Sequence, residues 1–247
     1  MIYSKENRVN IRYVNGDAIM NDRAYMFVME DAACEHSDME HQGLYDVQTT
    51  RKTWVLVAWK MKIVKRAKYG EMLLTKTWSS GNNKFFAYRE YEVYAGDEVI
   101  AYALSKWVMI DIDKEKVVKL DDDIMNAFKA ESHNLFYEDN SKFKECKAPT
   151  NLVFIKDEIV ASHQIDYNNH LHNTYYLDIA YDALKDKLGL NLHFNDIDIA
   201  YRKEIKKDDL IKCYYSFDEV EKAHYVVMKD ETSELTFAVV RLALSKQ

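Results

Sequence analysis

The sequence predicts an α+β protein made of two similar halves, each with one long helix packed on a curved antiparallel sheet. Two amphipathic helical patterns occur, and each is followed by several runs rich in β-branched and aromatic residues. A polar segment that contains the only proline, Pro149, separates the halves. We therefore expect a first domain over residues 1–115, a linker over 116–156 and a second domain over 157–247.

The two predicted helices share one apolar face. Both have apolar residues at i, i+3, i+4, i+7 and i+8, which is the pattern of a helix with one buried side. Gly189 then provides an end for the second helix. Each residue of the first face has a match 151 positions later: Tyr25 with Tyr176, Val28 with Ile179, Met29 with Ala180, Ala32 with Ala183, and Ala33 with Leu184.

A second correspondence follows the helices. Residues 63–78 resemble residues 200–215 at a separation of 137, because both stretches carry a basic pair, an acidic residue, an apolar pair and an aromatic end. This separation places Ala67 opposite Glu204. Two ungapped correspondences in the same order indicate an internal duplication.

Strand patterns complete each half. Turn-forming residues at 94–99 and 229–234 lie between apolar runs, so we expect a hairpin at the end of each half. Residues 53–64 alternate in character, which predicts a strand with five side chains on one side: Val55, Val57, Trp59, Met61 and Ile63.

Composition argues against several classes of protein. The 247 residues carry a net charge of −7, so broad nucleic-acid binding is not expected. No apolar run is long enough to span a bilayer and the start lacks a signal-peptide pattern, so we expect no membrane insertion. The cysteines Cys34, Cys146 and Cys213 are far apart, which argues against a disulfide framework or structural zinc site and fits a reducing cytoplasm.

The stretch DYNNHLHN, residues 166–173, combines polar groups suited to acid–base chemistry. Asn173 or Thr174 would cap the second helix, but capping does not account for Asp166, Asn168 and His170 at alternate positions. In an extended segment these three side chains would face one site, where the imidazole can move a proton near neutral pH. Metal binding is the weaker interpretation, because no further His or Cys cluster completes a ligand set.

The duplication provides a comparison within the chain. At the helix separation, the first half has Asn15, Asp17 and Ile19 where the second has the acid, the amide and the imidazole. At the strand separation it has Ala67 where the second has a glutamate. A requirement of the fold would preserve these polar residues in both halves. Their asymmetry favours a single active site in the second half, although drift in an inactive copy would leave the same pattern.

These residues resemble the motifs of the acyl-(acyl carrier protein) thioesterases of bacterial type, which are double hotdog proteins. The family's Asp-x-Asn-x-His run appears here as DYNNHLHN, and its Tyr-Arg-Arg-Glu-Cys block as YRKEI, residues 201–205. First-half blocks such as WVLVAWKMKI, TKTWSSG and SKWVMID are also similar, so the resemblance covers nearly the whole chain. It implies a tandem double hotdog fold, no cofactor, and catalytic roles for Asp166, Asn168, His170 and Glu204.

Two positions depart from the family pattern. His172 stands where an asparagine is usual, and its role is open. Ile205 stands where a cysteine often follows the motif glutamate, so that cysteine is not the nucleophile here. The departure leaves water, activated by a carboxylate and an imidazole, as the simpler mechanism.

The resemblance implies hydrolysis of fatty acyl thioesters of acyl carrier protein. Glu204 is then the general base for water, and His170 assists and protonates the leaving thiolate. Asn168 positions the carbonyl or the water, and Asp166 orients its neighbours or, alternatively, attacks to form an anhydride. Backbone N–H groups from Asn173 to Tyr175 are expected to bind the thioester oxygen. An apolar tunnel in the first half is expected to hold the acyl chain, lined by Trp54, Trp59 and Met61.

Acyl carrier protein is strongly acidic, so basic residues near the site are expected to dock it. The candidates are Arg202, Lys203, Lys206 and Lys207. Two other functions stay open: an acyl-CoA thioesterase, and a non-catalytic hotdog protein that binds acyl thioesters. A monomer and a homodimer fit equally well, because a duplicated chain already contains the pairing that single hotdog domains obtain by dimerising.

Overall fold

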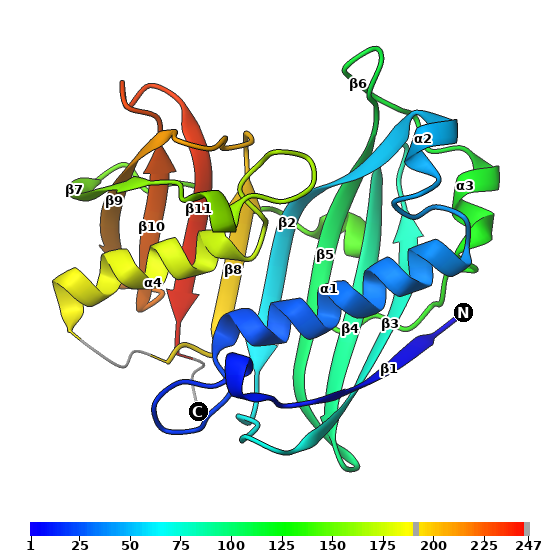
Figure 1. The fold of residues 1–247 in the computed structure, drawn as a ribbon, viewed down its shortest axis with the longest axis horizontal. Helices are drawn as coiled ribbons and strands as arrows, with labels where there is room; N and C mark the ends of the chain where they lie inside the picture. The colour runs from blue at the N-terminus through cyan, green and yellow to red at the C-terminus, as the bar shows by residue number, and fades with distance from the viewer. Residues whose placement is uncertain (190–192, 245–247) are drawn as a thin grey trace. The chain divides into compact units, whose positions relative to one another are not determined.

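The computed structural model describes residues 1–189 and 193–244, and it divides into two compact units, residues 1–144 and 145–247 (Figure 1). Each unit contains one long helix and an antiparallel sheet, as the sequence predicts for an α+β protein. None of the helices in the described part of the chain is long and apolar enough to cross a membrane.

In the first unit the strands are hydrogen-bonded in the order β1-β3-β4-β5-β2, and β6 pairs with the outer part of β5. The long helix α1 lies across this sheet in Figure 1. The elements in chain order are β1 (Tyr3–Arg8), α1 (Asp22–Met39), α2 (Val47–Thr50), β2 (Lys52–Ile63), β3 (Met72–Asn82), β4 (Phe86–Ala95), β5 (Glu98–Asp111), β6 (Lys116–Val117) and α3 (Asp122–Ala127), with short 3-10 turns at Ile11–Tyr13 and Asn140–Lys142.

The second unit repeats the plan with fewer strands, in the order β8-β11-β10-β9-β7. Its helix α4 packs against β7, β9, β10 and β11. The elements in chain order are β7 (Val153–Ile159), a 3-10 turn at Ser162–Gln164, α4 (Tyr175–Leu188), β8 (Asp196–Tyr201), β9 (Leu210–Asp218), β10 (Ala223–Lys229) and β11 (Thr236–Ala243).

Both helices bury the faces that their periodicity predicts. The five residues of the first face and the five of the second are all buried. The Asn21 side chain caps α1 by accepting a hydrogen bond from the N–H of Ala24 at 2.9 Å. Gly189 ends α4 with a positive φ of 90°, a conformation that glycine adopts without steric cost.

Strand β2 departs from simple alternation at a β-bulge. Leu56 pairs with Trp107 and Ala58 with Lys106, so Val57 is the extra residue. The prediction of one common side is right for Trp59, Met61 and Ile63 and wrong for Val55 and Val57. The bulge changes the alternation, so that Leu56 is buried while Val55 is 38% exposed. Both predicted hairpins are present, between β4 and β5 and between β10 and β11.

Part of the segment that follows β6 belongs to the core of the first unit. Leu120 and Met125 pack with Met109 on the sheet. Phe143 packs with Tyr88 and Leu104. The division between the compact units therefore falls after residue 144, within the polar segment that separates the halves of the sequence.

Candidate active site

The DYNNHLHN motif forms a tight loop. Ile165 and Leu171 form a β-bridge at its neck, and the N–H of Asp166 donates to the carbonyl of His170 at 2.8 Å. Asn169 turns the chain with a φ of 63°, a left-handed conformation that asparagine tolerates. The extended segment expected from alternate polar positions is therefore wrong. The motif residues are brought together by a turn, because short polar side chains bond their own backbone more readily than they continue a strand.

Asp166 holds this loop together. Its Oδ1 accepts hydrogen bonds from the backbone N–H of Asn168 at 2.8 Å and of His170 at 3.2 Å. The carboxylate thereby sets the backbone of both other motif residues. Asn168 is exposed at the tip of the loop, and His170 is half-buried beside it.

The loop lies beside the segment that carries Glu204. The N–H of Leu171 donates to the carbonyl of Ile205 at 2.7 Å, and His170 forms a β-bridge with Lys206. Glu204 is exposed, and its carboxylate makes no hydrogen bond or ion pair with any residue in 1–189 or 193–244. All four predicted catalytic residues therefore lie on two segments joined backbone to backbone.

Tyr176 anchors the start of α4 to the same segment. Its hydroxyl accepts a hydrogen bond from the backbone N–H of Ile205. Burial raises the pKa of Tyr176, and the negative charges of Glu204 and Asp166 raise it further. Both carboxylates therefore act on one hydroxyl. The sequence indicates Tyr176 only as part of an apolar face, because periodicity reports burial and says nothing of the polar atom at the end of the ring.

The first unit repeats this arrangement with Asn15, Asp17 and Ile19 in place of the acid, the amide and the imidazole. Ala18 has a φ of 62°, as Asn169 has in the second unit, and Asn15 donates to the carbonyl of Ile19 at 3.1 Å. The N–H of Met20 donates to Ala67 at 2.8 Å, which is the counterpart of the Leu171–Ile205 bond. The separation of 151 between the two motif loops is thus confirmed.

The separation of 137 for the following strand is wrong by one residue. The hydrogen bond from Met20 and the N–H that Ala67 donates to the Tyr25 hydroxyl at 2.8 Å both match Ala67 with Ile205, a separation of 138. Glu204 is therefore matched by Arg66 and not by Ala67. The error has a physical reason: both stretches are rich in lysine, so side-chain type leaves the register open, and the turn that follows decides it.

This corrected register adds a difference in charge. In the first unit Arg66 forms a partly buried ion pair with Asp22, at the first residue of α1. The matching positions in the second unit are Glu204 and Asn173. The first unit therefore has an ion pair where the second has an exposed carboxylate and an amide at the matching positions.

His172 supports the start of α4. It corresponds to Asn21, the cap of α1, and its Nδ1 lies 3.0 Å from the Thr174 hydroxyl and accepts the Thr174 N–H at 3.4 Å. The N–H of Tyr175 donates to the carbonyl of His172 at 2.9 Å. Of the predicted donors to a thioester oxygen, Thr174 and Tyr175 are thus occupied. The N–H of Asn173 has no partner in the described part of the chain, while its carbonyl accepts the Tyr201 hydroxyl at 3.0 Å.

The predicted docking residues are all exposed near Glu204. Arg202 bonds the carbonyl of Cys146 at 3.2 Å and lies 3.9 Å from Glu145. Lys207 lies 3.9 Å from Asp208. The ammonium groups of Lys203 and Lys206 make no ion pair with the residues that the structure describes.

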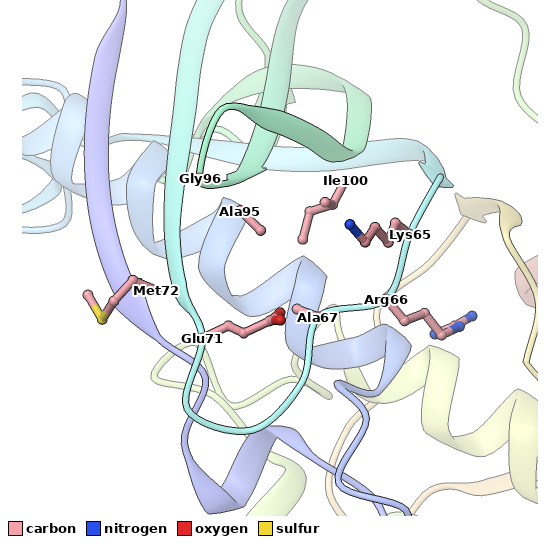
Figure 2. Close-up of a pocket in the computed structure, with 8 residues that line it drawn as sticks. All are labelled: Lys65, Arg66, Ala67, Glu71, Met72, Ala95, Gly96 and Ile100. Carbon is pink, nitrogen blue, oxygen red and sulfur yellow. The ribbon is translucent and has the colours of Figure 1, made fainter.

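The predicted tunnel residues belong to the interior of the first unit. Trp59 is 2% exposed and Met61 is fully buried, while Trp54 is half-buried against Phe128 at a ring distance of 6.2 Å. A cavity of about 400 Å³ lies elsewhere in this unit and contains none of the three (Figure 2). It is lined by Lys65, Arg66, Ala67, Glu71, Met72, Ala95, Gly96 and Ile100.

That cavity offers little for catalysis. Its two cations are already paired, Lys65 with Glu98 at 2.5 Å and Arg66 with Asp22. Figure 2 shows Glu71 with its carboxylate toward Ala67, and Glu71 accepts the N–H of Lys68 at 2.9 Å. Among the described residues, no group of three His, Cys, Asp or Glu side chains is placed to hold a metal ion.

Comparison with known proteins gives matches over both units. Residues 2–128 match the Acyl-ACP thioesterase N-terminal domain, and residues 148–239 match the Acyl-ACP thioesterase C-terminal domain. Oleoyl-acyl carrier protein thioesterase 1 from Arabidopsis thaliana is 22% identical over 202 residues, which are 74% of this chain and 55% of that protein. The chain spans about half the length of the curated relatives it matches.

Solved structures share the fold of the whole chain. An acyl-ACP thioesterase from Bacteroides thetaiotaomicron has a TM-score of 0.79 at 19% identity, over 98% of this chain and 97% of that one. The 12:0-ACP thioesterase from Umbellularia californica has a TM-score of 0.80 at 15% identity, over 98% and 96%. These similarities confirm the predicted tandem hotdog architecture.

Proposed function

The chain belongs to the acyl-ACP thioesterase family, and from that membership we propose that it hydrolyses fatty acyl thioesters of acyl carrier protein, releasing a fatty acid and the carrier thiol. One observation carries the proposal beyond family membership. The exposed Glu204 carboxylate has no partner among the described residues, and its segment is paired through the backbone with the segment that carries His170. A carboxylate that forms no ion pair is available to take a proton.

In the proposed mechanism Glu204 is the general base for water. His170 assists the proton transfer and protonates the leaving thiolate, while Asn168 positions the carbonyl or the water. Asp166 acts through the backbone, because its Oδ1 holds the N–H groups of both motif neighbours. This engagement supports orientation over direct attack. The N–H of Asn173 is the candidate donor to the thioester oxygen.

A cysteine nucleophile has no support. Ile205, at the family's cysteine position, is fully buried. Cys213 is also fully buried, and burial raises the pKa of its thiol to about 12, so almost no thiolate is present near neutral pH. Both facts favour water as the attacking group.

The carrier is proposed to dock on the basic residues around Glu204. Lys203 and Lys206 offer charges without ion pairs among the described residues, and electrostatic attraction to an acidic partner raises the rate of association. The cysteines form no disulfide among the described residues, which agrees with a reducing compartment, so we propose that the reaction occurs in the cytoplasm.

The test is release of free thiol from acyl carrier protein loaded with acyl chains of several lengths. We expect release by the wild type and a loss of about 10²- to 10⁴-fold in Glu204→Ala. Glu231→Ala, which removes an exposed carboxylate in the β10–β11 turn, is the matched control. Release from acyl-CoA alone would move the carrier assignment to coenzyme A. Binding of acyl thioesters without release would favour the non-catalytic alternative.

A further inference from the structure

Tyr201, the last residue of β8, links this strand to the segment that leads into α4. Its hydroxyl donates to the carbonyl of Asn173 at 3.0 Å, and its ring lies edge-on to the ring of Tyr176 at a centroid distance of 5.0 Å. The side chain is half-buried. The strand that ends three residues before Glu204 is therefore bonded to the residues between the motif loop and the helix.

The backbone that follows Tyr201 has a counterpart in the first unit. After β8, and likewise after β2, the N–H groups of two consecutive residues donate to one carbonyl of the neighbouring strand. These bonds join Arg202 and Lys203 to Phe237 at 2.8 and 3.2 Å, and Val64 and Lys65 to Ile100 at 2.7 and 3.1 Å. The residue just before this pair is Tyr201 in the second unit and Ile63 in the first, so these two residues match.

The comparison shows that this part of the fold does not need the Tyr201 hydroxyl. Ile63 is 2% exposed, and its side chain has no polar atom. It occupies the same place in its strand, opposite Ala101 on β5, as Tyr201 does opposite Ala238 on β11. The first unit thus completes the same backbone with an apolar residue. The hydrogen bond from Tyr201 to Asn173 belongs to the second unit alone.

The two long helices also begin at different places. α1 begins at Asp22, whereas α4 begins at Tyr175, two residues later than the residue that matches Asp22. That residue is Asn173, which lies outside α4 and whose carbonyl accepts the Tyr201 hydroxyl. The Tyr201 bond therefore coincides with a short stretch that belongs to the helix in the first unit and precedes it in the second.

Asn173 lies between two contacts to the residue that follows Glu204. On one side the N–H of Leu171 donates to the carbonyl of Ile205, and on the other the Tyr176 hydroxyl accepts the N–H of Ile205. Residues 171–176 are therefore held along the segment that carries Glu204. Of the three N–H groups expected to bind the thioester oxygen, that of Asn173 is the one without a partner among the described residues.

We propose that Tyr201 is a positioning residue for thioester hydrolysis. Its hydroxyl fixes the backbone of Asn173, so that the Asn173 N–H is held in place to donate to the thioester oxygen. This inference rests on the proposed function. A donor that is fixed before the reaction needs no reorganisation as negative charge develops on the oxygen, whereas a displacement of about 1 Å can lower the rate by about 10²-fold. Tyr201 acts through Asn173 and does not itself contact the substrate.

The first experiment compares kcat and KM of the wild type and Tyr201→Phe with carrier-bound acyl chains. The variant keeps the ring and loses only the hydroxyl, so we expect kcat to fall by about 10- to 10²-fold while KM changes by less than about twofold. Tyr214→Phe, which removes a half-buried hydroxyl bonded to Ser233 at 2.7 Å in the same unit, is the matched control and should keep its kcat. Tyr201→Ile should lose kcat in the same way, and it decides the outcome if Tyr201→Phe does not fold. A folded variant with the kcat of the wild type would overturn the proposal.

The second experiment measures binding and needs no turnover. Its probes are an alkyl trifluoromethyl ketone, which forms a tetrahedral hydrate in water, and the methyl ketone of the same chain length, which stays trigonal. We expect the wild type to bind the fluoroketone more tightly, and Tyr201→Phe to bind it at least about tenfold less tightly than the wild type while its affinity for the methyl ketone changes by less than about twofold. Equal losses for both ketones would show a general structural role and overturn the proposal. A wild type that releases no thiol from any chain would instead overturn the proposed function, and the two ketones would still decide on the role of Tyr201.

Discussion

Leu171 and Ile205 are joined by a backbone hydrogen bond of 2.7 Å, and this bond sets the geometry of the candidate site. It fixes the residue after His170 against the residue after Glu204. The same bond joins Met20 to Ala67 in the first unit at 2.8 Å. A feature common to both units thus positions the candidate catalytic residues, and the side chains beside it differ between the two units.

Substitutions of Asp166 will show whether this residue orients its motif neighbours or attacks the thioester as a nucleophile. Asn at this position keeps an oxygen that accepts the N–H groups of Asn168 and His170, whereas Ala removes it. We expect Asp166→Asn to retain activity within about tenfold and Asp166→Ala to lose about 10²-fold or more with a lower melting temperature. Rates and melting curves of both variants check this. Complete loss of turnover in a well-folded Asp166→Asn would favour the anhydride route.

The two left-handed residues of the motif loops predict opposite changes in stability. Ala18 has a φ of 62° without a side chain that favours it, so Ala18→Gly should raise the free energy of unfolding by about 1 kcal/mol. Asn169 tolerates the same conformation, so Asn169→Ala should lower it by about 1 kcal/mol. Denaturant unfolding measures both. Changes of the same sign would contradict the matched loop geometry.

Reversal of the basic charges will test carrier docking. Lys203→Glu and Lys206→Glu should raise KM for acyl carrier protein substrates, an effect that weakens at high salt, with little change in kcat. Lys185→Glu on α4, also an exposed lysine of this unit, is the control. Hydrolysis of acyl-CoA should be much less affected. An equal loss on both carriers would show that these lysines serve the site and not the docking surface.

Glu90 should make the stability of the first unit depend on pH. It is fully buried, and its Oε1 accepts from Asn140 at 2.8 Å and from the N–H of Leu135 at 3.3 Å. Its Oε2 and the Oδ1 of Asn140 are buried hydrogen-bond acceptors without a partner among the described residues. Protonation of Glu90 would supply a hydrogen-bond donor for one of these acceptors. Burial, opposed by these hydrogen bonds and reinforced by Glu92, raises the pKa of Glu90 to about 7.

The sign of the effect follows from proton linkage. The folded protein holds the Glu90 proton up to about pH 7, whereas an unfolded glutamate loses it near its model value of 4.5. The free energy of unfolding should therefore fall as pH rises from about 4.5 to 7, by on the order of 2–3 kcal/mol from this residue. Glu90→Gln should lack that component, so the difference between the wild-type and variant curves isolates it. A difference that does not vary with pH would contradict the assignment.

Periodicity predicts the parts of this fold whose side chains repeat. The buried faces of α1 and α4 are those expected, because an apolar stripe on a helix has few ways to leave water. The bulge at Val57 was not predictable in the same way. It adds one residue to a strand without changing composition, so the pattern contains no signal of where alternation shifts.

The candidate site also has a part that the sequence predicts and a part that it does not. Asp166, Asn168, His170 and Glu204 were selected from the sequence by their acid–base chemistry, by their asymmetry between the halves and by the resemblance to the family's motifs. The loop geometry could not be predicted from the sequence. It depends on the hydrogen bonds that Asp166 accepts from two backbone N–H groups, and every residue except proline has such a group. The one-residue error that paired Ala67 with Glu204 has the same origin.

The sequence by itself determined the two-unit α+β plan, the buried helix faces and the residues of the candidate site, because these depend on local periodicity and on side-chain chemistry. Only the tertiary structure decided which charged side chains are buried. Arg89 and Glu90 are consecutive residues on β4, yet one faces α1 and the other is covered by the segment after α3. Burial of a charge depends on what packs over it from distant parts of the chain, and no local pattern contains that information.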